Sequence, residues 1–212
     1  MKNLLLVWVF IWSAPVVLCA QEKGFSVLKS PQKLESALAQ NAAKTQTIVS
    51  DFIQEKNMKM LENKVLSHGK FYFKQPDKIR IEYTSPFTYL LIMTGGNIII
   101  KDGGKINKVN TRNSRTMQSV NQALMDCMRG TVFNNKDFTV NALEAASQYL
   151  LSLKPLDAAM KKMFSGILVY IQKSNLQVAK LVMTQNNGDT TVMKFSHTKI
   201  NSNLPDALFF IH

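Results

Sequence analysis

The stretch from Lys70 to Ile100, KFYFKQPDKIRIEYTSPFTYLLIMTGGNIII, decides the fold of this 212-residue chain. It consists of apolar, strand-like runs joined by the turn-forming sequences Gln75-Pro76-Asp77, Ser85-Pro86 and Gly95-Gly96. Bulky side chains recur at every second position, which places them on one face of a sheet. These side chains are Phe71, Phe73, Ile79, Ile81 and Tyr83, and the charged residues between them are Lys74, Lys78, Arg80 and Glu82. The pattern predicts an antiparallel meander with one apolar face.

The rest of the chain adds helices and further strands to this meander. Helical spacing of apolar residues predicts one helix over 32–44, opened by Ser30-Pro31, and another over 117–129, ended by Gly130. A helical turn is expected within 155–164. Strands are expected at 45–56, 65–74, 98–101, 105–109, 138–143, 149–153, 167–171, 177–184 and 191–196, and the tail 201–211 is expected to dock as a last strand or loop. We therefore predict a mainly β fold with α, as a single domain over 21–212.

The first twenty residues resemble a secretory signal peptide. Lys2 is followed by an apolar run over 4–12, and cleavage is expected after Ala20, which predicts export to the periplasm. Cys19 suggests lipoprotein processing as an alternative, but Leu18 stands where that processing needs a small residue.

Charge and cysteine content narrow the class of protein. The chain carries 26 Lys and Arg against 14 Asp and Glu, a net charge of +12. An exported chain is not expected to bind nucleic acid, so the charge serves solubility or attraction to anionic lipid headgroups or an acidic partner. After signal cleavage Cys127 is the single cysteine, so no internal disulfide is possible. We expect it to be a small buried hydrophobe rather than a nucleophile.

The sequence contains no recognisable catalytic or metal-binding constellation. The G-x-S-x-G, H-E-x-x-H and C-x-x-C patterns are absent, and His68, His197 and His212 have no second ligand at metal spacing. His197 is expected on a strand, facing solvent. We predict a protein without enzymatic activity, metal or cofactor. Eleven methionines are open to two interpretations, a surface that adapts to a ligand or ordinary core filling.

An ordered series of short motifs resembles the LolA family, the periplasmic carriers of outer-membrane lipoproteins. The series runs through DFIQ at 51–54, GKFYFKQP at 69–76, IRIEY at 79–83, Pro86, the turn at Asp102-Gly103 and the closing segment 203–210. The resemblance covers about residues 30–211.

The resemblance implies an unclosed antiparallel β-barrel with a helical lid, present as a monomer. Its apolar cavity takes up lipoprotein acyl chains from an inner-membrane ABC lipoprotein-release transporter and delivers them to an outer-membrane acceptor. The expected lipid-binding residues are Phe52, Phe71, Phe73, Ile79, Ile81, Tyr83 and Met93. The expected lid residues are Leu34, Leu38, Val120, Leu124 and Met128.

Gln75 is a departure from the family pattern, because many members carry arginine there and bond it to the lid. We expect Gln75 to act as a neutral latch between strand and lid. Two other functions stay open: a LolA-like binder or sensor of another amphiphile such as a glycolipid, and an outer-membrane acceptor anchored through Cys19.

Overall fold

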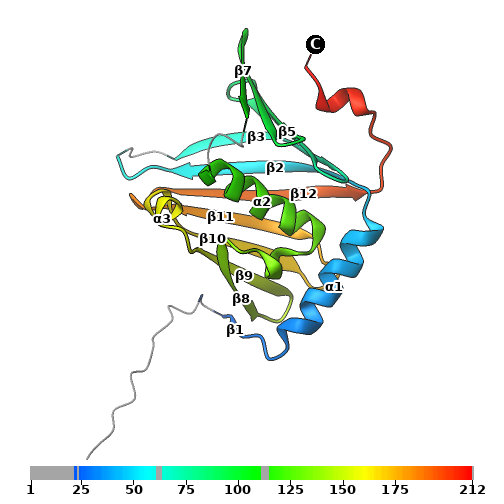
Figure 1. The fold of residues 1–212 in the computed structure, drawn as a ribbon, viewed down its shortest axis with the longest axis vertical. Helices are drawn as coiled ribbons and strands as arrows, with labels where there is room; N and C mark the ends of the chain where they lie inside the picture. The colour runs from blue at the N-terminus through cyan, green and yellow to red at the C-terminus, as the bar shows by residue number, and fades with distance from the viewer. Residues whose placement is uncertain (1–21, 23, 61–63, 111–114, 212) are drawn as a thin grey trace, which may run out of the picture.

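The computed structural model describes residue 22 and residues 24–60, 64–110 and 115–211. Their strands form one twelve-stranded antiparallel sheet in the order β1-β8-β9-β10-β11-β12-β2-β3-β4-β5-β6-β7. Its two ends, β1 and β7, do not pair with each other, so the sheet stays open. Helices α1 and α2 lie across one face of the sheet, here called the inner face (Figure 1). The opposite face is called the outer face. The predicted unclosed antiparallel barrel with a helical lid is confirmed.

The elements follow one another along the chain without a second sheet in the described residues. Their bounds are β1 Ser26–Val27, α1 Pro31–Lys44, β2 Thr47–Asn57, β3 Val65–Lys74, β4 Lys78–Ser85, β5 Tyr89–Thr94, β6 Asn97–Asp102, β7 Lys105–Asn110, α2 Arg115–Arg129, η2 Val132–Asn134, β8 Phe138–Glu144, β9 Gln148–Pro155, α3 Ala158–Met163, β10 Phe164–Gln172, β11 Val178–Gln185, β12 Thr190–Ile200 and η3 Asp206–Phe209.

The meander predicted from Lys70 to Ile100 forms β3 to β6, with its turns at the predicted prolines and glycines. Phe71 pairs with Ile81 and Phe73 with Ile79 across β3 and β4, and Ile79 pairs with Met93 across β4 and β5. Directly paired residues of antiparallel strands point to the same face. The period-two pattern therefore assembles one apolar patch from three strands.

Tertiary pairing extends several strands beyond their apolar runs. Strand β12 was expected over 191–196 but runs from Thr190 to Ile200, and its first residue pairs with Asn57 of β2. The Asn57 Nδ2 donates to Thr190 Oγ1 at 3.0 Å, so polar side chains continue the pairing where apolar ones stop. The short β1 was not predicted, and the tail ends in the 3-10 helix η3 rather than a strand.

Local sequence explains where two of the helices begin. Pro31 occupies the first turn of α1, where its missing N–H costs nothing. Asp157 caps α3 by accepting hydrogen bonds from the backbone N–H of Ala159 (2.9 Å) and Met160 (3.2 Å).

Two apolar clusters fill the space between the helices and the inner face. The first joins α1 to strands β8–β11 through Leu34, Leu38, Leu151, Leu153 and Val169. The second joins α2 to strands β2–β6 through Met125 and the buried Phe52, Phe73 and Ile79. Helix α1 therefore packs on β8–β11, whereas α2 contributes to both clusters, since its Ala123 lies in the first.

The C-terminal segment covers part of the outer face. Phe209 and Leu204 pack on Ile92 in a third buried cluster. Asp206 lies 2.7 Å from the Lys74 Nζ and 2.9 Å from the Lys78 Nζ, and hydrogen bonding to Lys74, then to Lys78, lowers the pKa of its carboxyl group. Apolar burial holds this segment, while the exposed ion pairs fix its position.

Replacing Phe209 with Ala should lower the free energy of unfolding by about 3–5 kcal/mol, because the side chain is completely buried and its loss leaves a cavity. Urea denaturation of the variant measures this change. The matched control is Phe210→Ala, since Phe210 is 50% exposed and its removal should cost much less. Equal losses for the two variants would contradict the docking of the tail.

Candidate functional site

An apolar cavity of about 90 Å³ lies between the two helices and the inner face. One wall comes from the helices and the other from strands of both halves of the sheet. The helix wall contains Leu38, Ala42, Leu124, Cys127 and Met128, and the sheet wall contains Ile48, Phe71, Val169, Leu181 and Phe195. Ser50 and Thr198 add the only hydroxyl groups of the sheet wall, and they bond to each other at 2.8 Å. The site can hold an apolar group but offers it few polar contacts.

The size of this cavity indicates a closed arrangement. The enclosed volume is about 90 Å³. Pockets that hold small ligands usually enclose about 300–1,000 Å³. A larger apolar ligand therefore requires α1 or α2 to move away from the sheet.

A second hollow of about 340 Å³ lies farther along the inner face. Val65, Tyr83, Pro86, Phe87 and Tyr89 line it. We call it the mouth hollow. The Tyr83 ring packs edge-on against Phe52 and Tyr89, with centroids 5.1 and 5.6 Å away, and burial raises the pKa of its hydroxyl. The mouth hollow therefore adjoins the apolar cluster that lies under α2.

The seven residues expected to bind lipid all lie in that one cluster on the inner face. Phe71 lines the cavity and Tyr83 lines the mouth hollow. The other members, Phe52, Phe73, Ile79, Ile81 and Met93, line neither opening and belong to the same cluster as Met125 of α2. In the closed arrangement most of the expected set serves as core beneath α2.

The expected lid residues divide between the two helices. Leu34 and Leu38 of α1 pack on the first cluster, and Leu124 and Met128 of α2 pack on the second. Leu38, Leu124 and Met128 also line the cavity. The side chain of Val120 lies outside the described residues, so its predicted role stays a prediction.

The β3–β4 turn holds both helices by their C-terminal ends. The Gln75 Nε2 donates to the carbonyl oxygens of Ala42 and Thr45, each at 2.9 Å, where α1 ends. Arg129, the last residue of α2, donates to the Pro76 oxygen from Nε at 3.1 Å and from Nη2 at 2.9 Å. The carbonyls at a helix C-terminus lack partners within the helix, so α1 accepts the amide of Gln75 readily.

The two helices also touch each other at Gly130. Its φ is +69°, which favours glycine. A Cβ atom at this position would lie 2.5 Å from the carbonyl carbon and oxygen of Leu38. The backbone of α1 thus passes directly over the end of α2. The missing side chain of Gly130 provides the space for this contact.

Asp126 organises the segment that follows α2. Its buried carboxylate accepts hydrogen bonds from Gln122 at 2.7 Å, Thr131 at 3.2 Å and Asn135 at 2.6 Å. These bonds fix the end of α2 relative to η2. The C-terminal end of α2 is consequently anchored at three places: Pro76, Leu38 and the η2 segment.

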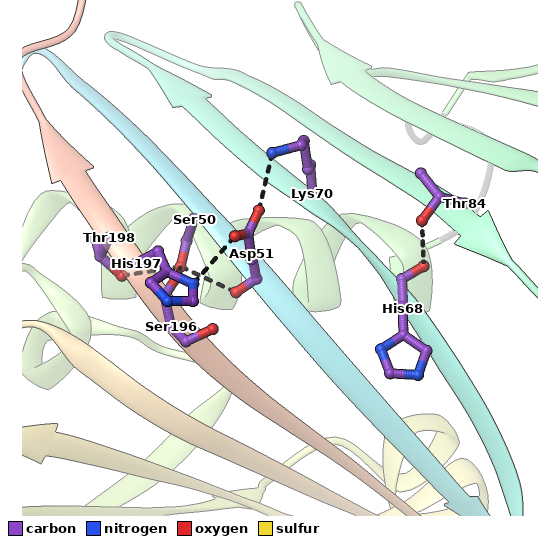
Figure 2. Close-up of polar contacts among 8 residues, drawn as sticks. All are labelled: Ser50, Asp51, His68, Lys70, Thr84, Ser196, His197 and Thr198. Carbon is purple, nitrogen blue, oxygen red and sulfur yellow. Dashed lines mark hydrogen bonds and ion pairs between the residues drawn. The ribbon is translucent and has the colours of Figure 1, made fainter.

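The polar cluster around His197 does not form a hydrolytic site. Asp51 accepts from Lys70 at 2.9 Å and lies 3.2 Å from the His197 Nδ1 (Figure 2). Hydrogen bonding to Lys70 lowers the pKa of Asp51. Ser50 points to the other face, since neighbouring residues of a strand alternate, and its hydroxyl bonds to Thr198 and the Ser196 oxygen. The exposed His197 matches the prediction of a solvent-facing strand residue.

Two further features of the described part of the chain bear on function. No group of three or more His, Cys, Asp and Glu residues among these residues is arranged to hold a metal ion. None of the helices within them is both long and apolar enough to cross a bilayer.

Sequence reasoning missed part of the cavity wall. Val169, Leu181 and Phe195 belong to strands that were expected, but nothing in their spacing indicated which face they share with Phe71. The face is set by the pairing of β12 with β2, which joins the two halves of the chain. Arg129 was also missed, because its partner is a backbone oxygen 53 residues away.

The model of the family described as "Outer membrane lipoprotein carrier protein LolA" matches residues 43–212, so the chain belongs to the LolA family. No curated protein sequence matches the chain.

Solved structures resemble it in fold at low sequence identity. An uncharacterized conserved protein from Thermus thermophilus is 12% identical with a TM-score of 0.50, over 85% of this chain and 93% of that one. The Pseudomonas aeruginosa MucA/MucB complex contains a chain 10% identical with a TM-score of 0.50, over 85% of this chain and 60% of that one. A LolA superfamily protein from Nitrosomonas europaea is 12% identical with a TM-score of 0.47, over 85% and 97%.

Cys127 reports on the closed cavity. Burial, with a smaller contribution from Asp126, raises the pKa of its thiol to about 12. The reactive thiolate is therefore scarce at pH 8, and a maleimide should label a native chain beginning at Gln21 on the order of a thousandfold more slowly than the same chain in urea. The native rate should rise with pH up to about 12. Equal rates in the native and the urea-unfolded chain would show that the thiol is not enclosed.

Proposed function

We propose that this protein is a periplasmic carrier that takes acylated lipoproteins from the inner to the outer membrane by enclosing their acyl chains against the inner face of the sheet. The observation that carries the proposal is the apolar cavity of a LolA-family chain, walled by two helices on one side and the sheet on the other. In this proposal the expected lipid-binding residues, Phe52, Phe71, Phe73, Ile79, Ile81, Tyr83 and Met93, meet the acyl chains once the helices have moved.

The energetics suit a carrier. Each methylene group of an acyl chain that leaves water contributes about 0.8 kcal/mol, so a few partly buried chains bind strongly. In the empty protein the same surface is covered by Leu38, Leu124 and Met128 instead. Binding therefore exchanges contacts between helix and sheet for contacts between lipid and sheet, which keeps the net affinity low enough for release.

Methionine supports this exchange. Met128 lines the cavity, while Met93, Met125 and Met193 belong to the cluster below α2. An unbranched thioether adopts many rotamers and packs against surfaces of different shape at little cost. In the closed form Met125 and Met128 of α2 face Met93 and Met193 of the sheet within this cluster, and all four are suited to pack against lipid in the open form.

In the same proposal the lipoprotein comes from an inner-membrane ABC transporter and passes to an outer-membrane acceptor without an energy source in the periplasm. Onward transfer then requires the carrier to bind its cargo more weakly than the acceptor does. The closed form lowers the affinity, because cargo binds only the fraction of molecules whose helices are open. The hydrogen bonds of the β3–β4 turn set that fraction.

The cavity itself can be tested with Met128→Gln. The change keeps the length of the side chain but places an amide among apolar groups, at a cost of about 1–3 kcal/mol when acyl chains surround it. Mass spectrometry of protein purified from the periplasm should find bound lipoprotein with the natural chain and on the order of tenfold less with the variant.

Met163→Gln is the control for this test, since Met163 lies on α3 with 46% of its surface exposed. It should retain cargo. Natural protein that contains no acylated protein, or contains another amphiphile, would refute lipoprotein carriage. Equal amounts of bound lipoprotein in the Met128 and Met163 variants would show that the acyl chains bind outside the cavity.

The latch can be tested with Gln75→Leu, which removes the bonds to the Ala42 and Thr45 oxygens. Two lost hydrogen bonds of about 0.5–1.5 kcal/mol each favour the open form on the order of tenfold. Cargo should then be retained, and transfer to the acceptor should slow more than uptake changes. Gln40→Leu is the control, because Gln40 is exposed on the same helix. Unchanged transfer by the Gln75 variant would remove the latch from the mechanism.

A further inference from the structure

The end of the sheet opposite the β3–β4 turn carries the mouth hollow. In an antiparallel sheet every second connection lies at the same end. The β2–β3, β4–β5 and β6–β7 connections therefore meet at this end, as the pairing of Val65 with Lys56 and of Tyr89 with Asp102 shows. We call it the open end. The latch bonds and the close contact between α1 and α2 lie at the other end.

Large apolar side chains gather at the open end in contact with water. Phe87 is 79% exposed and Met60 is 97% exposed, on two of these connections. Val65 and Leu66, at the start of β3, are 38% and 48% exposed. Scattered exposed apolar residues are normal on soluble proteins, but these four belong to the same end of the sheet, and Phe87 and Val65 line the mouth hollow there.

Lysines surround this apolar group. Lys59 and Lys64 lie on the β2–β3 connection, and Lys101 and Lys105 on either side of the β6–β7 turn, all exposed. Within the described residues, Lys59, Lys101 and Lys105 belong to none of the ion pairs.

The acidic residues of the open end offset this charge only in part. Glu55 is already shared by Lys64 at 3.6 Å and Lys194 at 3.0 Å. Asp189 accepts from the backbone N–H of Lys59 and from the Asn187 side chain. Asp102 is the acidic residue of the β6–β7 turn, between two lysines. The described part of the open end therefore keeps a positive charge.

We propose that the open end docks on an anionic membrane surface, with Phe87 and Met60 inserted among the lipids and Lys59, Lys101 and Lys105 beside the lipid phosphates. Apolar side chains that insert and cations that remain at the headgroups are the two components of interfacial binding. Docking in this way would turn the mouth hollow toward the acyl chains. In this respect the proposal rests on the proposed carrier function, because it names the surface at which cargo is exchanged.

Two simpler explanations account for only part of this surface. Lysines on an edge strand such as β7 prevent pairing with other chains, but that role does not require an exposed Phe87 on the β4–β5 connection. An acidic protein partner would attract the lysines but gains nothing from Met60, which is almost fully in water. An anionic bilayer uses both sets of side chains.

Co-sedimentation of the full mature protein with vesicles tests the proposal. Binding is expected to vesicles of phosphatidylethanolamine and phosphatidylglycerol, and not to vesicles of phosphatidylcholine alone. It should weaken with added salt, which screens charges over about 10 Å at 0.1 M. Lys101→Gln combined with Lys105→Gln should weaken it about thirtyfold, since each basic residue near an anionic leaflet contributes about a factor of five.

The matched control is Lys29→Gln combined with Lys33→Gln, which removes the same charge from exposed positions outside the open end and should bind as the natural chain does. Phe87→Ser should weaken binding without changing its salt dependence. Absence of binding at low salt, or equal weakening by both lysine pairs, would overturn the proposal.

Cargo measurements separate this proposal from the carrier function. The Lys101/Lys105 variant should still contain bound lipoprotein after purification, because neither residue lines the cavity. A chain that binds vesicles but never contains lipoprotein would refute the carrier and leave membrane docking in place. A chain that contains lipoprotein but does not bind anionic vesicles would refute membrane docking and leave the carrier function in place.

Discussion

The contact between two helices and one apolar face of the sheet is the interaction on which the rest of the structure depends. Twelve strands present more apolar surface than the sheet can bury by itself, because the sheet does not close. Helix α1 covers the half made by β8–β11, and α2 covers the half made by β2–β6 and also reaches the first half through Ala123. Both packed clusters and the cavity between them exist only while the helices stay in place.

The helices are held mainly at one end. Gln75 and Arg129 tie their C-terminal ends to the β3–β4 turn through hydrogen bonds to backbone oxygens, and Gly130 lets the end of α2 touch the middle of α1 at Leu38. The partly buried bonds of the neutral Gln75 amide contribute about 0.5–1.5 kcal/mol each, and those of the charged Arg129 are exposed to water, so together they contribute much less than the apolar contacts. Such an arrangement lets a helix leave the sheet around a fixed end without unfolding the protein.

The two ends of the sheet thus differ in chemistry. The latch end consists of hydrogen bonds and close packing, which restrict the helices. The open end combines a hollow of about 340 Å³ with exposed apolar side chains and uncompensated lysines. The positive net charge of the chain by itself fits solubility as well as lipid binding. Part of that charge lies at the open end. In the proposed mechanism one end regulates access and the other meets the membrane.

Much of this protein follows from its sequence alone. Period-two alternation from Phe71 to Tyr83 decides which side chains share a face, since successive residues of a strand must point to opposite sides. Turn residues fixed the connections, and helical spacing located α1 and α2 to within about two residues. Leu38, Leu124 and Met128 could be assigned to the helix side of the site for the same reason.

Other features depend on contacts between distant segments, which no local pattern specifies. The pairing of β12 with β2 unites the two halves of the sheet and brings Phe195 beside Phe71, with ring centroids 5.7 Å apart. Burial of Phe73 and Ile79 as core, rather than as cavity wall, depends on where α2 lies. The bond from Arg129 to the Pro76 oxygen depends on the same placement. Alternation and helical spacing are properties of neighbouring residues, so the sequence determined the apolar face, whereas only the tertiary structure decided what covers it.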